Sequence, residues 1–295
     1  MNPPSFVTRR RFLRDGSLLL LAAGATTPRT VLADEPPPAR LARFGLLTDL
    51  HYADKPTRGS RHYRESLDKL QAAGEQLRRA EPDAIVELGD LIDAAPDVDD
   101  EQRWLASIYR PFSKISDRRH CVLGNHCVDT LTKQEFLAGV EQPRSYYSFD
   151  ISGVHGVVLD ACFRSDGEPY GRRNFQWTDP NIPADQLEWL RQDLAATRLP
   201  TVVFAHQRLD VGQPYGVRNA KAVRKILEDS QRVLAVFQGH SHKNEHRQIG
   251  DIHYCTLVAM VEGAGADNSG FATLDVLPEG NLLLTGFLRQ QDYRW

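Results

Sequence analysis

The sequence predicts an α/β protein in which helices cover a mixed, partly parallel sheet, and three observations support this fold class. First, the chain has 295 residues, of which 41% are hydrophobic and 25% charged. This composition is typical of globular proteins and argues against disordered, collagen-like and disulfide-stabilised chains. Second, short apolar runs recur without strict alternation, as expected for strands buried on both faces. Third, segments with helical periodicity lie between several of these runs, which favours a layered arrangement.

Seven apolar runs rich in Val, Ile, Leu and Phe are expected to form strands, because turn-forming residues flank each of them. They are Phe44–Thr48, Ala84–Leu88, Cys121–Leu123, Val154–Leu159, Thr201–Ala205, Val233–Phe237 and Tyr254–Val258. Two further runs, around residues 146–149 and 282–284, are expected to lie in antiparallel hairpins.

Four segments carry apolar residues at helical spacing. In the first, Leu67, Leu70, Ala73 and Leu77 recur on one face, and Glu81-Pro82 ends the pattern. The other three segments contain residues 104–108, 187–194 and 223–227. Because no Gly/Ser-rich or charged linker follows Leu41, residues 41–295 are expected to form one domain.

Residues 1–33 are expected to form a signal peptide of the twin-arginine type. Paired arginines followed by Phe12-Leu13 precede an apolar run, Ser17 to Ala25, and small residues end at Ala33. That run is much shorter than the roughly 20 residues that a spanning helix needs, so no membrane anchor is expected. Residues 34–40, with three consecutive prolines, are expected to be a linker. The mature protein would be periplasmic or secreted, and the twin-arginine export machinery would be its partner.

Charge and cysteine content restrict the remaining function classes. The net charge of −3 lacks the basic excess that binding a nucleic-acid backbone requires. The four cysteines match no CxxC metal pattern. Cys121, Cys162 and Cys255 at least are therefore expected to be small core residues.

Polar clusters follow five of the predicted strands, at the edge of an α/β sheet where ligands bind. Their carboxylates, imidazoles and one amide, without a thiolate, favour divalent ions such as Mn, Fe or Zn. Alternate residues of an extended segment face the same side, so both ends of D-x-H and of H-x-H are expected to reach a metal. A central aspartate would bridge two ions about 3.5–4 Å apart. The clusters are Asp49-Leu50-His51, Gly89-Asp90-Leu91-Ile92-Asp93, Gly124-Asn125-His126, His206 and Gly239-His240-Ser241-His242.

This order of motifs resembles the calcineurin-like metallophosphoesterase family, from about Phe44 to His242. The resemblance implies a four-layer αββα sandwich of two mixed sheets flanked by helices. It also implies a metal-dependent phosphoric ester hydrolase with two divalent ions, Mn in the first place and Fe, Zn or Mg as alternatives. In this family's pattern one ion would be held by Asp49, His51 and His242 and the other by Asn125, His206 and His240, with Asp90 bridging.

The resemblance also implies a mechanism in which His126 is the general acid near the leaving group. Asp93 is expected to orient the His126 imidazole through a hydrogen bond. In the expected reaction a metal-bound hydroxide attacks phosphorus while His126 protonates the departing oxygen.

A second segment resembles the branch of this family typified by manganese-dependent ADP-ribose/CDP-alcohol diphosphatases. It contains Tyr52-Ala53-Asp54 followed by Arg61-His62-Tyr63-Arg64. The implied substrates are small phosphate esters or nucleoside diphosphate derivatives. Tyr52, Arg61, Tyr63 and Arg64 are expected to bind a second phosphate or a base, because guanidinium groups match phosphate oxygens and aromatic faces stack on rings. The alternative is that they form the solvated start of a helix.

The loop Arg164–Asp179 is a second candidate for a substrate-binding wall, or a packed surface loop. Two other functions stay open beside the diphosphatase. A broad phosphomonoesterase of alkaline-phosphatase type would use the same core. A non-catalytic scaffold would be expected to lack ligands or the acid, yet Asp90 and His126 are both present.

Overall fold

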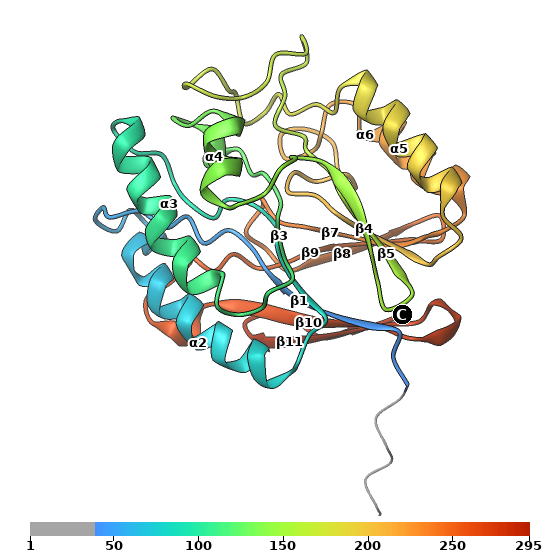
Figure 1. Ribbon diagram of the computed structural model, residues 1–295. Coiled ribbons are helices and arrows are strands. Elements are labelled where there is room, and N and C mark those ends of the chain that lie inside the picture. The colour runs from blue at the N-terminus through green and yellow to red at the C-terminus, as the bar shows by residue number, and fades with distance from the viewer. Residues whose placement is uncertain (1–38) are drawn as a thin grey trace, which may run out of the picture. The chain divides into compact units, whose positions relative to one another are not determined.

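The computed structural model describes residues 39–295, in which two sheets stack face to face and helices cover their outer sides (Figure 1). The first sheet has the strand order β12 (Tyr293–Arg294), β11 (Leu282–Leu288), β10 (Gly270–Val276), β1 (Ala42–Leu47), β2 (Ala84–Glu87) and β3 (Arg119–Cys121). The second has the order β4 (Tyr147–Ile151), β5 (Val154–Val158), β6 (Thr201–Phe204), β7 (Val233–Gln238), β9 (Ile252–Thr256) and β8 (Glu245–Ile249). The expected four-layer sandwich of two mixed sheets is confirmed.

The helices cover the two sheets in pairs. Helices α2 (Ser66–Arg79) and α3 (Val98–Phe112) pack on the first sheet, and α5 (Ala184–Ala196) and α6 (Ala220–Ser230) pack on the second (Figure 1). All four match the segments with helical periodicity. A fifth, α4 (Lys133–Gly139), was not expected. Among residues 39–295 no helix has the length and apolarity needed to cross a membrane.

Three apolar cores explain why the strands lack strict alternation. Leu47 and Ile85 belong to the core beneath α2 and α3, whereas Phe44 belongs to the core between the sheets. Phe204 of the second sheet packs on Phe44 at a ring-centroid distance of 5.6 Å. Its neighbour Val203 faces the third core, beneath α5 and α6. Successive residues of a strand are therefore apolar because both faces of each sheet are covered.

The strands that precede the polar clusters run parallel within each sheet. β1, β2 and β3 are parallel neighbours in the first sheet, as are β5, β6, β7 and β9 in the second. Their carboxyl ends therefore deliver loops to the same end of each sheet. The predicted single edge is in fact made by two sheets, because residues 49–126 come from the first and residues 206–242 from the second.

The predicted signal peptide, 1–33, and residues 34–38 of the predicted linker lie outside the described residues. Ala39–Trp295 forms one compact unit, with β1 beginning at Ala42. All four cysteines are free and buried, as expected for Cys121, Cys162 and Cys255.

Candidate active site

The loops after the strands adopt an unusual backbone conformation at five of the seven predicted ligands. Left-handed φ angles occur at Asp49 (52°), His51 (43°), Asp90 (58°), His240 (71°) and His242 (61°). The expectation of extended D-x-H and H-x-H segments was therefore wrong. Such angles are costly for residues other than glycine and persist where the surrounding structure enforces them. Here the Asp49 and His51 amides donate to the carbonyls of Gly89 (2.9 Å) and Asp90 (2.7 Å), which joins the first two loops.

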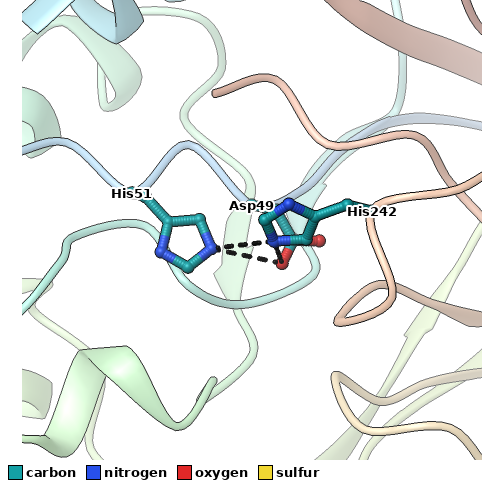
Figure 2. A group of neighbouring side chains, drawn as sticks. All are labelled: Asp49, His51 and His242. Atoms are coloured by element: carbon teal, nitrogen blue, oxygen red, sulfur yellow. Dashed lines mark hydrogen bonds and ion pairs between the residues drawn. The ribbon is translucent and has the colours of Figure 1, made fainter. Parts of the chain in front are cut away.

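Asp49, His51 and His242 form the first group of candidate ligands, and Figure 2 shows the three side chains converging. The Nε2 atoms of the two histidines are 3.1 Å apart and lie 3.6 and 3.4 Å from Asp49 Oδ1. Asp49 Oδ2 accepts hydrogen bonds from Thr48 and from the His240 amide, whereas the buried Oδ1 has no hydrogen-bond partner. A carboxylate oxygen left free beside two imidazole nitrogens fits a bound cation.

Asp90, His206 and His240 form the second group. His206 Nε2 lies 3.1 Å from Asp90 Oδ2 and 3.3 Å from His240 Nδ1. His206 Nδ1 is 2.9 Å from the Leu88 carbonyl oxygen, to which it must donate, so in the neutral imidazole Nε2 carries the lone pair. Asn125 lines the same cavity, and its buried Oδ1 has no hydrogen-bond partner.

Asp90 of the second group also lies close to the first group. Its Oδ2 is 3.1 Å from His206 Nε2 in one group and 3.5 Å from His51 Nε2 in the other. Its Oδ1 accepts a hydrogen bond of 2.8 Å from the His126 amide, which fixes the carboxylate plane. This is the position that a carboxylate shared by both groups would occupy.

The electrostatics of the site favour cations. Burial alone would raise the pKa of Asp49 and Asp90. The imidazole of His242 lowers the pKa of Asp49, and that of His206 lowers the pKa of Asp90, so both pKa values lie below their usual range. Both carboxylates are therefore ionised at neutral pH, although they are at most 1% exposed. Buried anionic oxygens need positive partners, and the donor set of carboxylates, imidazoles and an amide oxygen suits divalent metal ions.

His126 and Asp93 form a separate pair beside these groups. His126 Nδ1 is 2.9 Å from Asp93 Oδ1, and the imidazole is 24% exposed while the carboxylate is almost fully buried. Burial alone would lower the pKa of His126, but Asp90 and Asp93 outweigh it and raise the pKa. Lys55 was not singled out in the sequence, and its Nζ lies 3.3 Å from Asp93 Oδ2.

A cavity of about 330 Å³ opens onto the site. Another cavity, of about 360 Å³, lies elsewhere on the surface beside Tyr109 and Arg119, and none of the candidate ligand groups lines it. The cavity at the site is lined by His51, Arg61, Asp90, Asn125, His126, Trp177, Tyr215, His240 and His242. Six of these nine residues were predicted as metal ligands or as the general acid, namely His51, Asp90, Asn125, His126, His240 and His242. The predicted site is therefore accessible to a small molecule.

Only one of the four predicted substrate-binding residues lines this cavity, namely Arg61. Tyr52 and Tyr63 are 8% and 4% exposed and pack in the core, so the prediction that they stack on a substrate was wrong. Arg64 points to the surface, where its Nε is 2.6 Å from Asp54 Oδ1. The segment leads into α2, and packing of that helix takes the aromatic rings inward.

Two aromatic residues take the place of those tyrosines at the cavity. Trp177 and Tyr215 are 43% and 41% exposed, and their rings lie 5.6 Å apart. Both also lie near the ring of His240, at 6.1 and 6.0 Å. Trp177 belongs to the candidate loop 164–179, but Tyr215 lies in a loop with no sequence signal. Elsewhere in that candidate loop Tyr170 is buried, as expected for a packed surface loop.

Sequence reasoning also missed Glu262, which follows β9 and belongs to none of the five motifs. Its Oε1 lies 2.6 Å from His242 Nδ1. A carboxylate in an irregular segment carries no pattern of its own, so only the folded arrangement reveals it.

Comparison with known proteins agrees with this geometry. A manganese-dependent ADP-ribose/CDP-alcohol diphosphatase from Arabidopsis thaliana is 25% identical over 85% of this chain and 96% of its own length. Purple acid phosphatase 22 from the same plant is 28% identical over 43% of this chain and 28% of its own. The crystal structure of a dimetal phosphatase from Danio rerio superposes with a TM-score of 0.75 at 22% identity, covering 87% of this chain and 99% of that one. Because the model of the calcineurin-like phosphoesterase family matches residues 42–244, the chain belongs to that family of metal-dependent hydrolases.

Proposed function

We propose that this protein uses two divalent ions, Mn²⁺ in the first place, to hydrolyse the phosphoanhydride bond of nucleoside diphosphate-linked small molecules such as ADP-ribose or CDP-alcohols. One observation carries the proposal. Asp90 Oδ2 lies 3.5 Å from His51 Nε2 and 3.1 Å from His206 Nε2, beside a cavity that is also lined by an arginine and two aromatic rings. The name of the Arabidopsis relative supports the choice of substrate class.

Asp49, His51 and His242 would hold one ion, Asn125, His206 and His240 would hold the other, and both would share Asp90. When bound, such ions polarise phosphoryl oxygens and lower the pKa of coordinated water. The chain contributes the positions of the ligands, because the strained loops and the buried carboxylates determine where each donor atom lies.

His126 would donate the proton to the departing oxygen. Its partly exposed imidazole faces the cavity, and the hydrogen bond to Asp93 orients the ring. Since Asp90 and Asp93 raise the pKa of His126, the imidazole keeps its proton to a higher pH than a free histidine. The leaving group is then protonated as it departs.

Arg61, Trp177 and Tyr215 would distinguish a nucleoside diphosphate from a simple ester. Arg61 lines the cavity and is 33% exposed, so its guanidinium can reach a second phosphate, although its NH1 also lies 4.0 Å from Asp93 Oδ2. The exposed rings of Trp177 and Tyr215 offer a face on which a base can stack. An aryl monophosphate would use neither feature.

A substrate panel with the Mn²⁺-loaded enzyme tests this proposal. We expect ADP-ribose and a CDP-alcohol to be hydrolysed with higher kcat/KM than a bis(aryl) phosphate or an aryl monophosphate. Trp177→Ala and Tyr215→Ala should raise KM for the nucleotide substrates, since stacking on one ring stabilises a base by about 1–3 kcal/mol. Leu288→Ala is the matched control, because Leu288 is a large hydrophobic side chain, 54% exposed, that does not line the cavity.

Two outcomes would contradict the proposal. A preference for the aryl monophosphate, unaffected by Trp177→Ala, would favour the phosphomonoesterase. Inactivity toward the whole panel with Mn, Fe, Zn and Mg would favour the non-catalytic scaffold.

We also propose that residues 1–33 direct periplasmic or secretory export through the twin-arginine machinery. The sequence of this segment alone supports the proposal. Replacing Arg9 and Arg10 together with lysine should retain the protein in the cytoplasm in a cell-fractionation experiment. Unchanged export of that variant would refute the twin-arginine route.

A further inference from the structure

His242 is the only candidate ligand in the described residues whose imidazole is paired with a carboxylate outside the five motifs. Its Nδ1 lies 2.6 Å from Glu262 Oε1, and its Nε2 lies 3.4 Å from Asp49 Oδ1. An ionised carboxylate only accepts hydrogen bonds, so the Nδ1 hydrogen points at Glu262. In the neutral imidazole Nε2 then carries the lone pair, and this atom faces Asp49 and His51.

The segment that carries Glu262 is fixed by an unusual buried cation. Lys69 of α2 is 0% exposed, and its ammonium group donates to the carbonyls of Met260 (2.9 Å), Glu262 (3.1 Å) and Gly263 (2.6 Å). A lysine ammonium has three hydrogens, so its whole donor capacity is used on this one segment. Burying a charge is costly, which makes the arrangement informative about what it holds in place.

The same segment is tied directly to the loop of the first ligand group. The amides of Met260 and Val261 donate to the carbonyls of Thr48 (3.1 Å) and Asp49 (3.0 Å). Residues 260–263 therefore connect the backbone at Asp49 with the side chain that orients His242. Both contacts act on the first ligand group.

The second group has no comparable support. His206 donates to a backbone carbonyl, and the buried Nε2 of His240 has no hydrogen-bond partner. A carboxylate orients an imidazole more strongly than a neutral carbonyl does, and it increases the basicity of the coordinating nitrogen. The support from Glu262 is thus specific to one side of the site.

We infer that Glu262, held in place by Lys69, is a positioning residue for His242 and strengthens ion binding at the Asp49, His51 and His242 group but not at the other. This inference rests on the dinuclear centre proposed above. Glu262 touches no reacting atom in this scheme and acts only through His242. Its side chain is 19% exposed, so its replacement should leave the core intact.

Equilibrium dialysis against Mn²⁺ tests the inference without relying on turnover. Glu262→Ala should weaken one of two bound ions by about 10- to 100-fold and leave the other unchanged. Glu262→Gln, which keeps an acceptor oxygen but not the charge, should lose less. Asp150→Ala is the matched control, because Asp150 also accepts from a histidine Nδ1 at 2.6 Å, that of His155, outside the ligand groups.

Lys69→Met provides a second variant, with unfolding of the metal-free protein measured in parallel. It should weaken the same ion as Glu262→Ala. The double variant should bind that ion little more weakly than Glu262→Ala alone, because both changes disrupt one connection. Additive losses would overturn the role assigned to Lys69.

The outcomes separate this inference from the proposed function. Two tightly bound ions in both the wild type and Glu262→Ala would overturn the inference alone, as would equal weakening of both ions. Fewer than two ions in the wild-type protein would overturn the dinuclear centre and this inference with it.

Discussion

Replacing His126 with alanine is expected to slow hydrolysis in proportion to how poorly the leaving group departs. His126 lines the cavity and is hydrogen-bonded to Asp93 at 2.9 Å. The folded protein raises the pKa of its imidazole. His126 belongs neither to the ligand group of Asp49 nor to that of Asp90. An activated aryl oxide leaves as an anion without help, whereas an alkoxide or a nucleotide phosphate gains from protonation. The loss should therefore grow with the pKa of the leaving group.

The size of the effect follows from the place of His126. A positioned general acid contributes about 10²- to 10⁴-fold, which corresponds to about 3–5 kcal/mol of transition-state stabilisation. His126→Ala leaves every candidate ligand unchanged. The hydrogen bond from residue 126 to Asp90 Oδ1 also remains, because the backbone amide donates it. Metal binding should therefore be retained, and the whole loss should appear in kcat.

The assay is a series of phosphodiesters with one constant group and leaving groups of increasing pKa, measured with the wild type and His126→Ala. His246→Ala is the control, because His246 lies on β8 and does not line the cavity. Equal losses for the best and the poorest leaving groups would refute the role of His126 as an acid.

The pH profile gives a second check on the same pair. Because the folded protein raises the pKa of His126, activity toward poor leaving groups should persist above the unperturbed value near 6.5 and fall as pH rises through the raised value. Asp93→Asn removes a charge that stabilises the imidazolium, so this descending limb should move to lower pH. A limb that stays in place would show that another group controls it.

Three further predictions concern the metal site and the stability of the fold. Gly124→Ala should abolish metal binding in a dialysis assay, because a Cβ there would meet the Asp90 carboxylate, whereas Gly212→Ala, with nothing within 4 Å, should bind normally. His155→Gln should lower the free energy of unfolding by about 1–3 kcal/mol at pH 6, since its imidazole pairs with Asp193 at 2.9 Å. Burial alone would lower the pKa of His155, but its carboxylate neighbours raise it. The stabilisation by His155 is therefore complete below the pKa of the unfolded chain and disappears as pH rises through the pKa of the folded protein. Equal losses at pH 6 and pH 9 in urea unfolding would contradict this pH dependence. Chelation should abolish phosphoesterase activity and added Mn²⁺ should restore it, whereas activity that survives complete metal removal would rule out metal-dependent hydrolysis.

Much of the fold could be predicted because most strands are buried on both faces and so appear as apolar runs. The runs at residues 84–88 and 201–205 became β2 and β6 almost without a shift. β8 escaped because Glu245–Ile249 is a polar edge strand with no buried residue. β10 was missed although all its residues are buried. α4 was missed because it is a short helix. The sequence feature that could have predicted it is its capping box, formed by Thr132 and Glu135.

The candidate ligand groups could be predicted because each of their residues lies within four positions of the end of a strand, so the sheet order brings them to one place. The cavity wall could not, since Tyr215 and Glu262 belong to loops whose course depends on distant packing. The Tyr52 and Tyr63 prediction failed for a related reason, because nothing in the sequence distinguishes an aromatic ring that enters the core from one that faces a ligand.

Asp90 follows a strand of one sheet and His206 a strand of the other, so the layer of side chains between the sheets sets the distance between the candidate ligands. Phe44 and Phe204 meet in that layer at 5.6 Å. Replacing either phenylalanine with a smaller residue would let the two sheets move closer or shift along each other. The distance between the two ligand groups would then change as well. Catalytic tuning in this protein is therefore open to substitutions deep in the apolar interior, at positions that never touch an ion or a substrate.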